Sequence, residues 1–197
     1  MAATSSTSTS TLTPTPLTGA CFCKALRFRL APATEADCTL SAFCHCSKCQ
    51  LLNGAPFVWT THWVERAVRW LGPASGPSPL TGNKEGDQPL LLPNKPDLPA
   101  SMATFNTMPG RKWKIRCATC GTPMGSWNEA KREWTLWPTT LDRPSGNGQA
   151  GEVGSVRDIT AWFRPTHHMF YGGWRAVDVL DGLPRYIGYE ANSERVP

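Results

Sequence analysis

The sequence predicts a mainly β fold, and three observations support this expectation. Its 197 residues include 17 glycines, 18 prolines and 9 tryptophans, a composition that favours short strands and long loops over helices. Several short stretches alternate apolar and polar residues, as strands with one buried face do. Most of the 8 cysteines fall into three tight clusters, which indicates a fold organised around bound metal.

The chain divides into a tail and one domain. Residues 1–18 are rich in Ser and Thr and carry no charge, so they cannot bury a core and are expected to be disordered. The remainder, 19–197, has a length typical of a single domain. Pro- and Gly-rich sequence over 72–103 predicts an insertion, and 142–154 predicts a second long loop.

Between these loops the alternation predicts strands. In Ala25–Leu30 the apolar residues Leu26, Phe28 and Leu30 share one face. Lys112–Cys117 alternates basic with apolar residues, which we interpret as an ordinary half-exposed strand rather than a nucleic-acid surface. The other strand candidates are Phe57–Thr61, Val68–Leu71 and Trp134–Trp137.

One helical turn is expected between Ala25–Leu30 and Phe57–Thr61. Ser47 would be its N-cap and Gly54 would follow its last residue, as the preferences of helix ends predict.

The cysteine clusters are Cys21-Phe-Cys23, Cys44-His-Cys46-Ser-Lys-Cys49 and Cys117-Ala-Thr-Cys120. The two pairs together offer four ligands, which would close a tetrahedral structural zinc site. Gly121 supplies a permissive φ directly after the second pair. The triplet leaves one coordination position open, as a catalytic zinc requires. We therefore expect two zinc ions per chain with different roles.

Disulfides are the main alternative, and redox thiols or an iron–sulfur cluster are others. The cysteine content is about half the density that marks a small disulfide framework. Cys-x-x-Cys in an intracellular protein instead indicates metal or redox chemistry. No secretory signal or transmembrane-length apolar run is visible. We expect a cytoplasmic protein with no membrane partner, and a targeting role of the tail stays open.

The triplet of Cys44, Cys46 and Cys49 predicts a particular chemistry. Three thiolates on one Zn²⁺ leave a net negative charge, which disfavours hydrolysis by bound water and favours binding of a substrate thiol. Lys48, backbone N–H groups or the start of the helical turn could balance the added charge, although Lys48 could equally be solvated. His45 lies between two ligands, and this geometry argues against it as a fourth.

Four other residues are weaker candidates. We interpret Cys38, His62, His167 and His168 as packed side chains, with a reactive thiol or a catalytic base as the alternative.

Three motifs resemble the glutathione-dependent formaldehyde-activating enzyme family, which also contains centromere protein V. They are Gly19-Ala-Cys21-Phe-Cys23, Cys44-His-Cys46-Ser-Lys-Cys49 and Arg116-Cys117-Ala-Thr-Cys120-Gly121. The segment Asp181-Gly-Leu-Pro-Arg-Tyr186 is similar to the closing segment of that family. Two departures are Lys24 and Gln50, where the family usually has Gly and Arg.

The resemblance implies a β-tent of antiparallel sheets that meet at a structural zinc. By the motif match, the ligands of that zinc are Cys21, Cys23, Cys117 and Cys120. The match also implies that Cys44, Cys46 and Cys49 hold a catalytic zinc, linked in the family to glutathione and S-hydroxymethylglutathione.

Two functions follow as hypotheses. The first is a zinc-dependent carbon–sulfur lyase acting on a thiol–aldehyde adduct, similar to S-(hydroxymethyl)glutathione synthase. Its partner would be a small thiol such as glutathione, and the formal charge of +5 suits an anionic ligand. The alternative is a non-catalytic zinc module that binds protein or nucleic acid, as centromere protein V permits. A basic tail would favour the second, and 1–18 has no charge, so nucleic acid is not expected as a partner.

Overall fold

The computed structural model describes residues 16–73, 101–109, 111–142, 163–173 and 175–196. Strands in two sheets dominate this part of the chain, so the prediction of a mainly β fold is confirmed. Most of the expected tail, of the insertion 72–103 and of the loop 142–154 lies outside the described residues. Leu17 and Thr18, which we assigned to the tail, instead begin the first strand.

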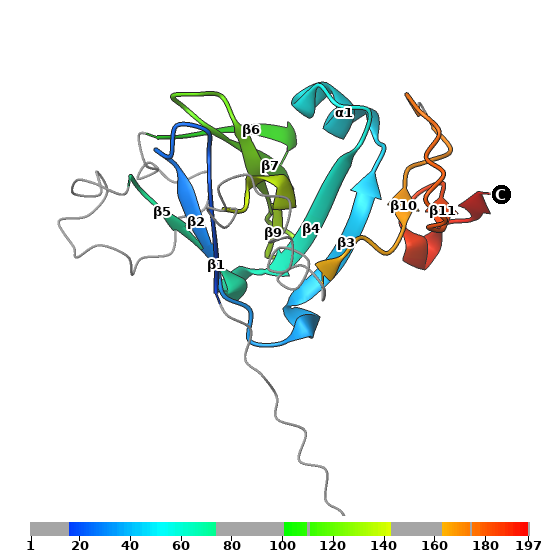
Figure 1. Ribbon diagram of the computed structural model, residues 1–197, viewed down its shortest axis with the longest axis horizontal. Helices are drawn as coiled ribbons and strands as arrows, with labels where there is room; N and C mark the ends of the chain where they lie inside the picture. Colours follow the sequence, from blue (N-terminus) through cyan, green and yellow to red (C-terminus); the bar gives the residue numbers. More distant parts are fainter. Residues whose placement is uncertain (1–15, 74–100, 110, 143–162, 174, 197) are drawn as a thin grey trace, which may run out of the picture.

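The smaller sheet contains three antiparallel strands in the order β1 (Leu17–Ala20), β2 (Arg27–Leu30) and β5 (Val68–Leu71). It lies at one end of the molecule (Figure 1). Phe28 and Leu30 are buried from β2, and Leu26 is buried just before it, which confirms the predicted apolar face. The alternation therefore decided which side of this strand enters the core.

The larger sheet has nine strands. In spatial order they are β12 (Arg195–Val196), β11 (Arg185–Tyr186), β10 (His168–Met169), β3 (Cys38–Cys44), β4 (Val58–Val64), β9 (Glu133–Leu136), β8 (Pro123–Asn128), β7 (Lys112–Cys117) and β6 (Met102–Met108). All pairs are antiparallel except those of β10, which runs parallel to β3 and to β11. The short 3₁₀ turns are η1 (Glu35–Asp37), η2 (Glu65–Ala67), η3 (Pro138–Thr140) and η5 (Glu190–Asn192).

Aromatic side chains join the two sheets. Phe28 of β2 meets Trp70 of β5 edge to face at 5.7 Å, and Trp70 meets Trp134 of β9 at the same distance. Trp134 then packs on Trp127 of β8 at 4.5 Å. Such pairs contribute about 0.5–1.5 kcal/mol each beyond their burial. Three of the nine tryptophans therefore help to pack the two sheets together.

The helix α1 (Ser47–Asn53) connects β3 to β4 and lies above the sheet in Figure 1. Gly54 ends it with φ 57°, as predicted. The predicted N-cap was wrong by one residue. Cys46, rather than Ser47, is the N-cap, because its sulfur accepts a hydrogen bond from the Cys49 amide. Among the described residues no helix is long and apolar enough to cross a membrane.

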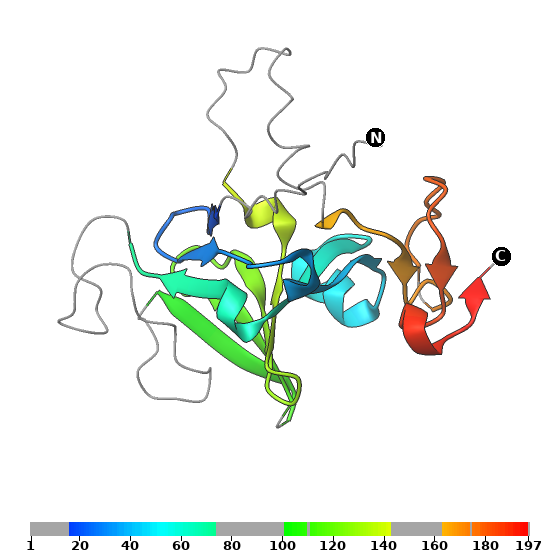
Figure 2. The same cartoon turned by 90° about the horizontal axis from the view of Figure 1, so that it is seen from below.

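The C-terminal segment forms the end of the large sheet that lies opposite the small sheet, as Figures 1 and 2 both show. Backbone amides tie it to β3 and to the residue that follows: Phe43 donates to His167 O and His45 donates to Met169 O, both at 3.0 Å. This pairing brings residues more than 120 positions away in the sequence against the Cys44–Cys46 strand end.

Candidate metal centres

The first cysteine cluster combines the two pairs. Cys21 precedes β2 in the small sheet, and Cys117 ends β7 in the large sheet, so the cluster joins the sheets. The sulfurs of Cys21, Cys23, Cys117 and Cys120 all lie within 4.8 Å of one another. The Cys21–Cys23 and Cys23–Cys117 sulfur separations are 3.6 and 3.7 Å.

These separations fit a tetrahedral ion. A Zn–S bond of about 2.3 Å in tetrahedral geometry places the sulfurs about 3.8 Å apart, whereas a disulfide would bring two of them to about 2.0 Å. All of the cysteines are free thiols. The donor set and its spacing therefore fit a closed four-thiolate metal site.

Each pair sits on a tight backbone turn. The amide of Leu26 donates to Cys21 Sγ at 3.3 Å, and Lys24 has the left-handed φ of 61°. In the second pair Gly121 has φ 72°, as predicted, and its amide donates to Cys117 O at 3.0 Å. A left-handed φ strains residues that have a Cβ. Lys24 therefore holds a backbone conformation that glycine would adopt with less strain.

The second cluster is the triplet. Cys44 ends β3, Cys46 caps α1 and Cys49 lies in its first turn. The Cys44 thiol donates to Cys46 Sγ at 3.4 Å, and the Cys49 amide donates to the same sulfur at 3.4 Å. Among the described residues no His, Asp or Glu joins these three as a further ligand. Three sulfurs at this spacing fit an ion that keeps one position open.

The charge in the triplet is centred on one sulfur. Hydrogen bonds from Cys44 and Cys49 hold the pKa of Cys46 far below its usual range. The same hydrogen bond raises the pKa of Cys44, and burial raises it further. Cys46 is therefore the first thiol of the three to become a thiolate, which is the form that binds metal.

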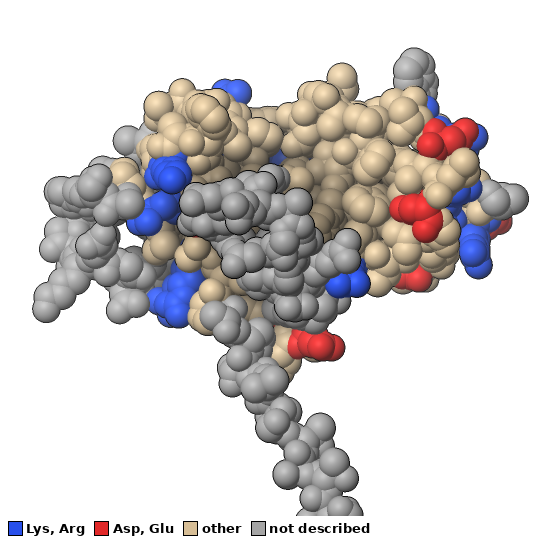
Figure 3. Space-filling model, viewed as in Figure 1, with Lys and Arg blue, Asp and Glu red and all other residues tan. Residues whose placement is uncertain are grey.

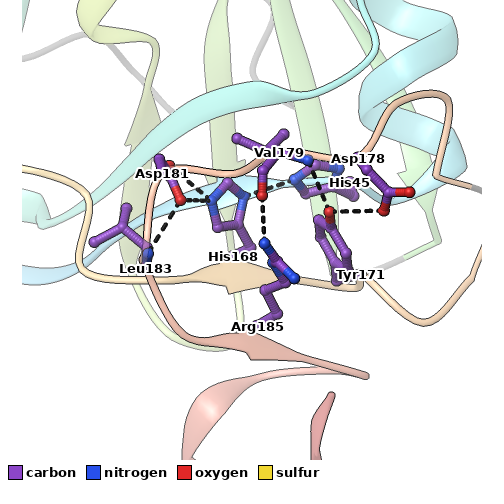
Figure 4. A network of polar contacts seen from close by, with 8 residues as sticks. All are labelled: His45, His168, Tyr171, Asp178, Val179, Asp181, Leu183 and Arg185. Atoms are coloured by element: carbon purple, nitrogen blue, oxygen red, sulfur yellow. Dashed lines mark hydrogen bonds and ion pairs between the residues drawn. The ribbon is translucent and has the colours of Figure 1, made fainter. Parts of the chain in front are cut away.

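His45 points away from the cluster. Its Nε2 lies 2.8 Å from His168 Nδ1, and His168 Nε2 lies 3.0 and 3.1 Å from the two Asp181 oxygens (Figure 4). Both imidazoles are fully buried. We expected His45 not to be a ligand because its neighbours already reach the metal; the reason in the structure is this hydrogen bond to His168.

The network sets the protons on both rings. Burial opposes ionisation of Asp181, but the Leu183 amide and His168 outweigh it and lower its pKa, so the carboxylate accepts from His168 Nε2–H. His168 Nδ1 then accepts from His45 Nε2–H. The remaining His45 Nδ1 carries no proton and has no hydrogen-bond partner among the described residues. Burial lowers the pKa of His45 to about 4, which keeps it neutral near pH 7.

Tyr171 and Arg185 brace the same region. The Tyr171 ring meets His45 edge to face at 4.8 Å, and its hydroxyl accepts from the Val179 amide at 2.9 Å and donates to Asp178 (Figure 4). Arg185 lies over the Tyr171 ring at 5.1 Å. The closing segment, Asp181–Tyr186, therefore packs through Arg185 and Tyr171 against His45 of the triplet loop.

The histidine pair divides between two environments. We interpreted His167 and His168 as packing residues, and both are buried, but His168 also belongs to the network. His167 faces the other way, 2.9 Å from the Thr166 hydroxyl and 3.4 Å from Glu190. Sequence reasoning missed the His168–Asp181 connection, although Asp181 is the first residue of the closing segment.

Two lysines of β7, rather than Lys48, face the triplet. Lys48 Nζ reaches Thr107 O of β6 at 3.5 Å, away from the sulfurs. The Lys114 ammonium instead contributes to lowering the pKa of Cys46, and the thiolates in turn act on Lys112. Our interpretation of β7 as half-exposed was wrong at Lys114, whose exposed fraction is only 7%. Leu52 of α1 and Trp137 line a pocket together with Lys114 on that face of the strand.

The other two candidates are packed residues, as expected. Cys38 is half-buried, and burial raises its pKa to about 12, so it stays a thiol. His62 is buried in β4, and burial lowers its pKa to about 3, so it stays neutral.

Together the fold and the two clusters define a mainly β protein with two cysteine sites spaced for metal ions. Comparison with known families agrees with the resemblance seen in the sequence. The model of the family described as glutathione-dependent formaldehyde-activating enzyme matches residues 16–84. The match includes the first pair and the triplet, while Cys117 and Cys120 lie beyond it.

Other comparisons are more distant. A crystal structure of a Rhodobacter sphaeroides protein covers 70% of this chain and 97% of its own, at 15% identity and a TM-score of 0.42. No curated protein gives a significant match.

Proposed function

We propose that this protein is a zinc-dependent carbon–sulfur lyase of the S-(hydroxymethyl)glutathione synthase type, which adds a thiol to formaldehyde or reverses that addition. The observation that supports it most is the open three-sulfur cluster, which lies inside the segment matched by the formaldehyde-activating family. In the forward direction the thiol sulfur bonds to the aldehyde carbon, and the proton lost by the thiol ends on the aldehyde oxygen. No oxidant is required.

The proposal assigns a zinc ion to each cluster. Cys21, Cys23, Cys117 and Cys120 would hold a structural ion, and Cys44, Cys46 and Cys49 a catalytic one. A zinc bound by three thiolates supplies a thiophilic position at which a further thiol loses its proton readily. The four-cysteine cluster joins both sheets, which supports the proposal that 19–197 is one domain.

The protein's own residues supply the charge balance. Three thiolates and a substrate thiolate make this region strongly anionic, and Lys112 and Lys114 are the cations whose charges act on it. An ammonium in a largely buried site interacts more strongly with a thiolate than it would in water. These lysines would therefore favour the deprotonated form of the substrate.

The histidine network would hold the triplet loop in place. His45 lies between two cysteines of the cluster, and its hydrogen bond to His168 ties the loop to Asp181. This role is positional, because the imidazoles point away from the sulfurs.

The test compares two cysteine variants. Zinc-loaded wild type should bind glutathione in calorimetry and accelerate adduct formation with formaldehyde above the uncatalysed rate. Cys46→Ser should lose both properties, and Cys38→Ser, which alters a cysteine outside both clusters, should keep them. If no thiol binds and all three proteins give the same rate, the enzyme proposal fails and a non-catalytic zinc module takes its place.

A further inference from the structure

A pocket lies beside the triplet, between α1 and the β6–β8 part of the large sheet. Its walls include Leu52, Phe105, Lys114, Arg116 and Trp137. Its cavity volume is about 100 Å³. This is below the range of about 300–1,000 Å³ typical of sites that enclose a whole small ligand, so the pocket has room for one small group such as a carboxylate. The face seen in Figure 3 is hollowed beneath α1, with few charged side chains inside the hollow.

Lys114 is the unusual member of this lining. It is 93% buried, and within the described part of the chain its ammonium makes no hydrogen bond or ion pair; its contact is with the Trp137 ring at 5.1 Å. Burying a charge without a partner is costly. Its charge also acts on the Cys46 and Cys49 thiolates, but none of the described hydrogen bonds or ion pairs joins it to them directly. The ammonium is therefore left able to contact an anionic group of a bound ligand.

The pocket and the triplet are close enough for one ligand to reach both. Cys49 and Leu52 lie one turn apart on α1, a distance of about 5 Å along the helix axis. Two residues of extended peptide span about 7 Å. A small peptide that contains a cysteine can therefore place its thiol at the triplet while a carboxylate enters the pocket.

We propose that Lys114 binds a carboxylate of the substrate, so that the site selects anionic peptide thiols rather than thiols in general. Arg116, which is exposed at the pocket and lies 5.9 Å from the Phe105 ring, is placed to meet a second anionic group. This inference rests on the proposed function for the position of the thiol. The competing explanation is that Lys114 only neutralises the three thiolates.

Three probes separate these explanations. Glutathione has a thiol and two carboxylates, its diethyl ester keeps the thiol without the carboxylates, and S-methylglutathione keeps the carboxylates without a free thiol. Calorimetry with the zinc-loaded full chain should show that wild type binds glutathione at least about tenfold more tightly than the ester.

Variants then assign the preference to Lys114. Lys114→Met should weaken binding of glutathione and of S-methylglutathione about tenfold or more and leave the ester unchanged, and Lys114→Arg should retain part of the preference. Lys131→Met is the matched control, because Lys131 is an exposed lysine in the turn between β8 and β9, outside the triplet loop and the pocket lining. It should bind all three probes as wild type does.

Each result has one meaning. Equal affinity of wild type for glutathione and the ester overturns the inference, and this measurement needs no variant to fold. A loss in Lys114→Met that is the same for both thiols, or that accompanies loss of zinc, also overturns it and favours charge neutralisation. If S-methylglutathione binds in a Lys114-dependent way but no adduct formation is catalysed, the carboxylate site stands and the proposed function fails. If wild type does not bind S-methylglutathione, the carboxylate site is refuted.

Discussion

The two cysteine clusters should differ sharply in what their loss does to the fold. Cys117→Ser removes a ligand from the cluster that joins the small sheet to the large sheet. Cys46→Ser removes one from a loop followed by α1, a helix with no buried residue. The first change should unfold or loosen the domain, and the second should release only the helix and its loop.

The magnitudes support this contrast. Metal binding at a four-cysteine site is worth about 10–16 kcal/mol in small zinc domains, whereas whole domains are stable by about 5–15 kcal/mol. The free energy lost with the structural ion can therefore exceed the free energy of unfolding of the whole domain. Fraying of a seven-residue helix that buries no side chain should change the free energy of unfolding by about 1 kcal/mol, the amount of one helix cap.

Urea denaturation followed by tryptophan fluorescence measures both effects, since Trp127 and Trp134 lie in the core between the sheets. Zinc released per chain is measured in parallel with a colorimetric chelator. We expect Cys46→Ser to unfold in a cooperative transition and to retain one zinc per chain. Cys117→Ser should lose the cooperative transition. Equal destabilisation of the two variants, with Cys38→Ser unaffected, would refute the division into structural and functional sites.

Three further predictions concern the surroundings of the clusters. Lys24→Gly should stabilise the protein by about 1 kcal/mol in thermal or urea unfolding, because it relieves a left-handed φ of 61° beside Cys23. Asp181→Asn should cost about 1–2 kcal/mol and alter the tautomer of His168, read from its ¹⁵N imidazole shifts, while zinc at the four-cysteine cluster is retained. The third concerns pH: His45 titrates near pH 4 in the folded chain against about 6.5 unfolded, so the unfolded chain binds the proton first as pH falls. His45 should therefore reduce stability by about 3 kcal/mol in total between pH 6.5 and 4 and have no effect above that window. His45→Phe should flatten this part of the urea midpoint–pH curve, and an unchanged curve would contradict it.

Local patterns in the sequence predicted the parts of the molecule that depend on local geometry. Ligand spacing identified the two pairs and the triplet, because one or two residues between cysteines are enough to place neighbouring sulfurs around one ion. Counting four ligands then predicted that the two pairs share one cluster. Alternation identified the buried face of β2, and Gly121 identified the left-handed turn after Cys120.

Two of the errors came from contacts between distant segments, and the third, at the N-cap of α1, is local. Lys114 is buried on a side of β7 where it contacts Trp137 and shares a pocket with Leu52 of α1, which an alternating pattern within the strand cannot reveal. The network of His45, His168 and Asp181 depends on β10 pairing with β3 across more than 120 residues. The N-cap of α1 is Cys46 and not the predicted Ser47, because the Cys46 sulfur accepts the hydrogen bond that a side-chain oxygen usually accepts at this position.

The span of the two clusters along the chain sets the order in which they can assemble. The triplet needs six consecutive residues, so its ligands are complete as soon as Cys49 has left the ribosome. The four-cysteine cluster must close a loop of 94 residues between Cys23 and Cys117, and it cannot form until β7 has been synthesised. Loop closure over such a distance carries an entropic cost, and contacts that are this far apart in the sequence form slowly. In a newly made chain the triplet thiols are therefore accessible to metal ions and to oxidants before the four-cysteine cluster joins the two sheets.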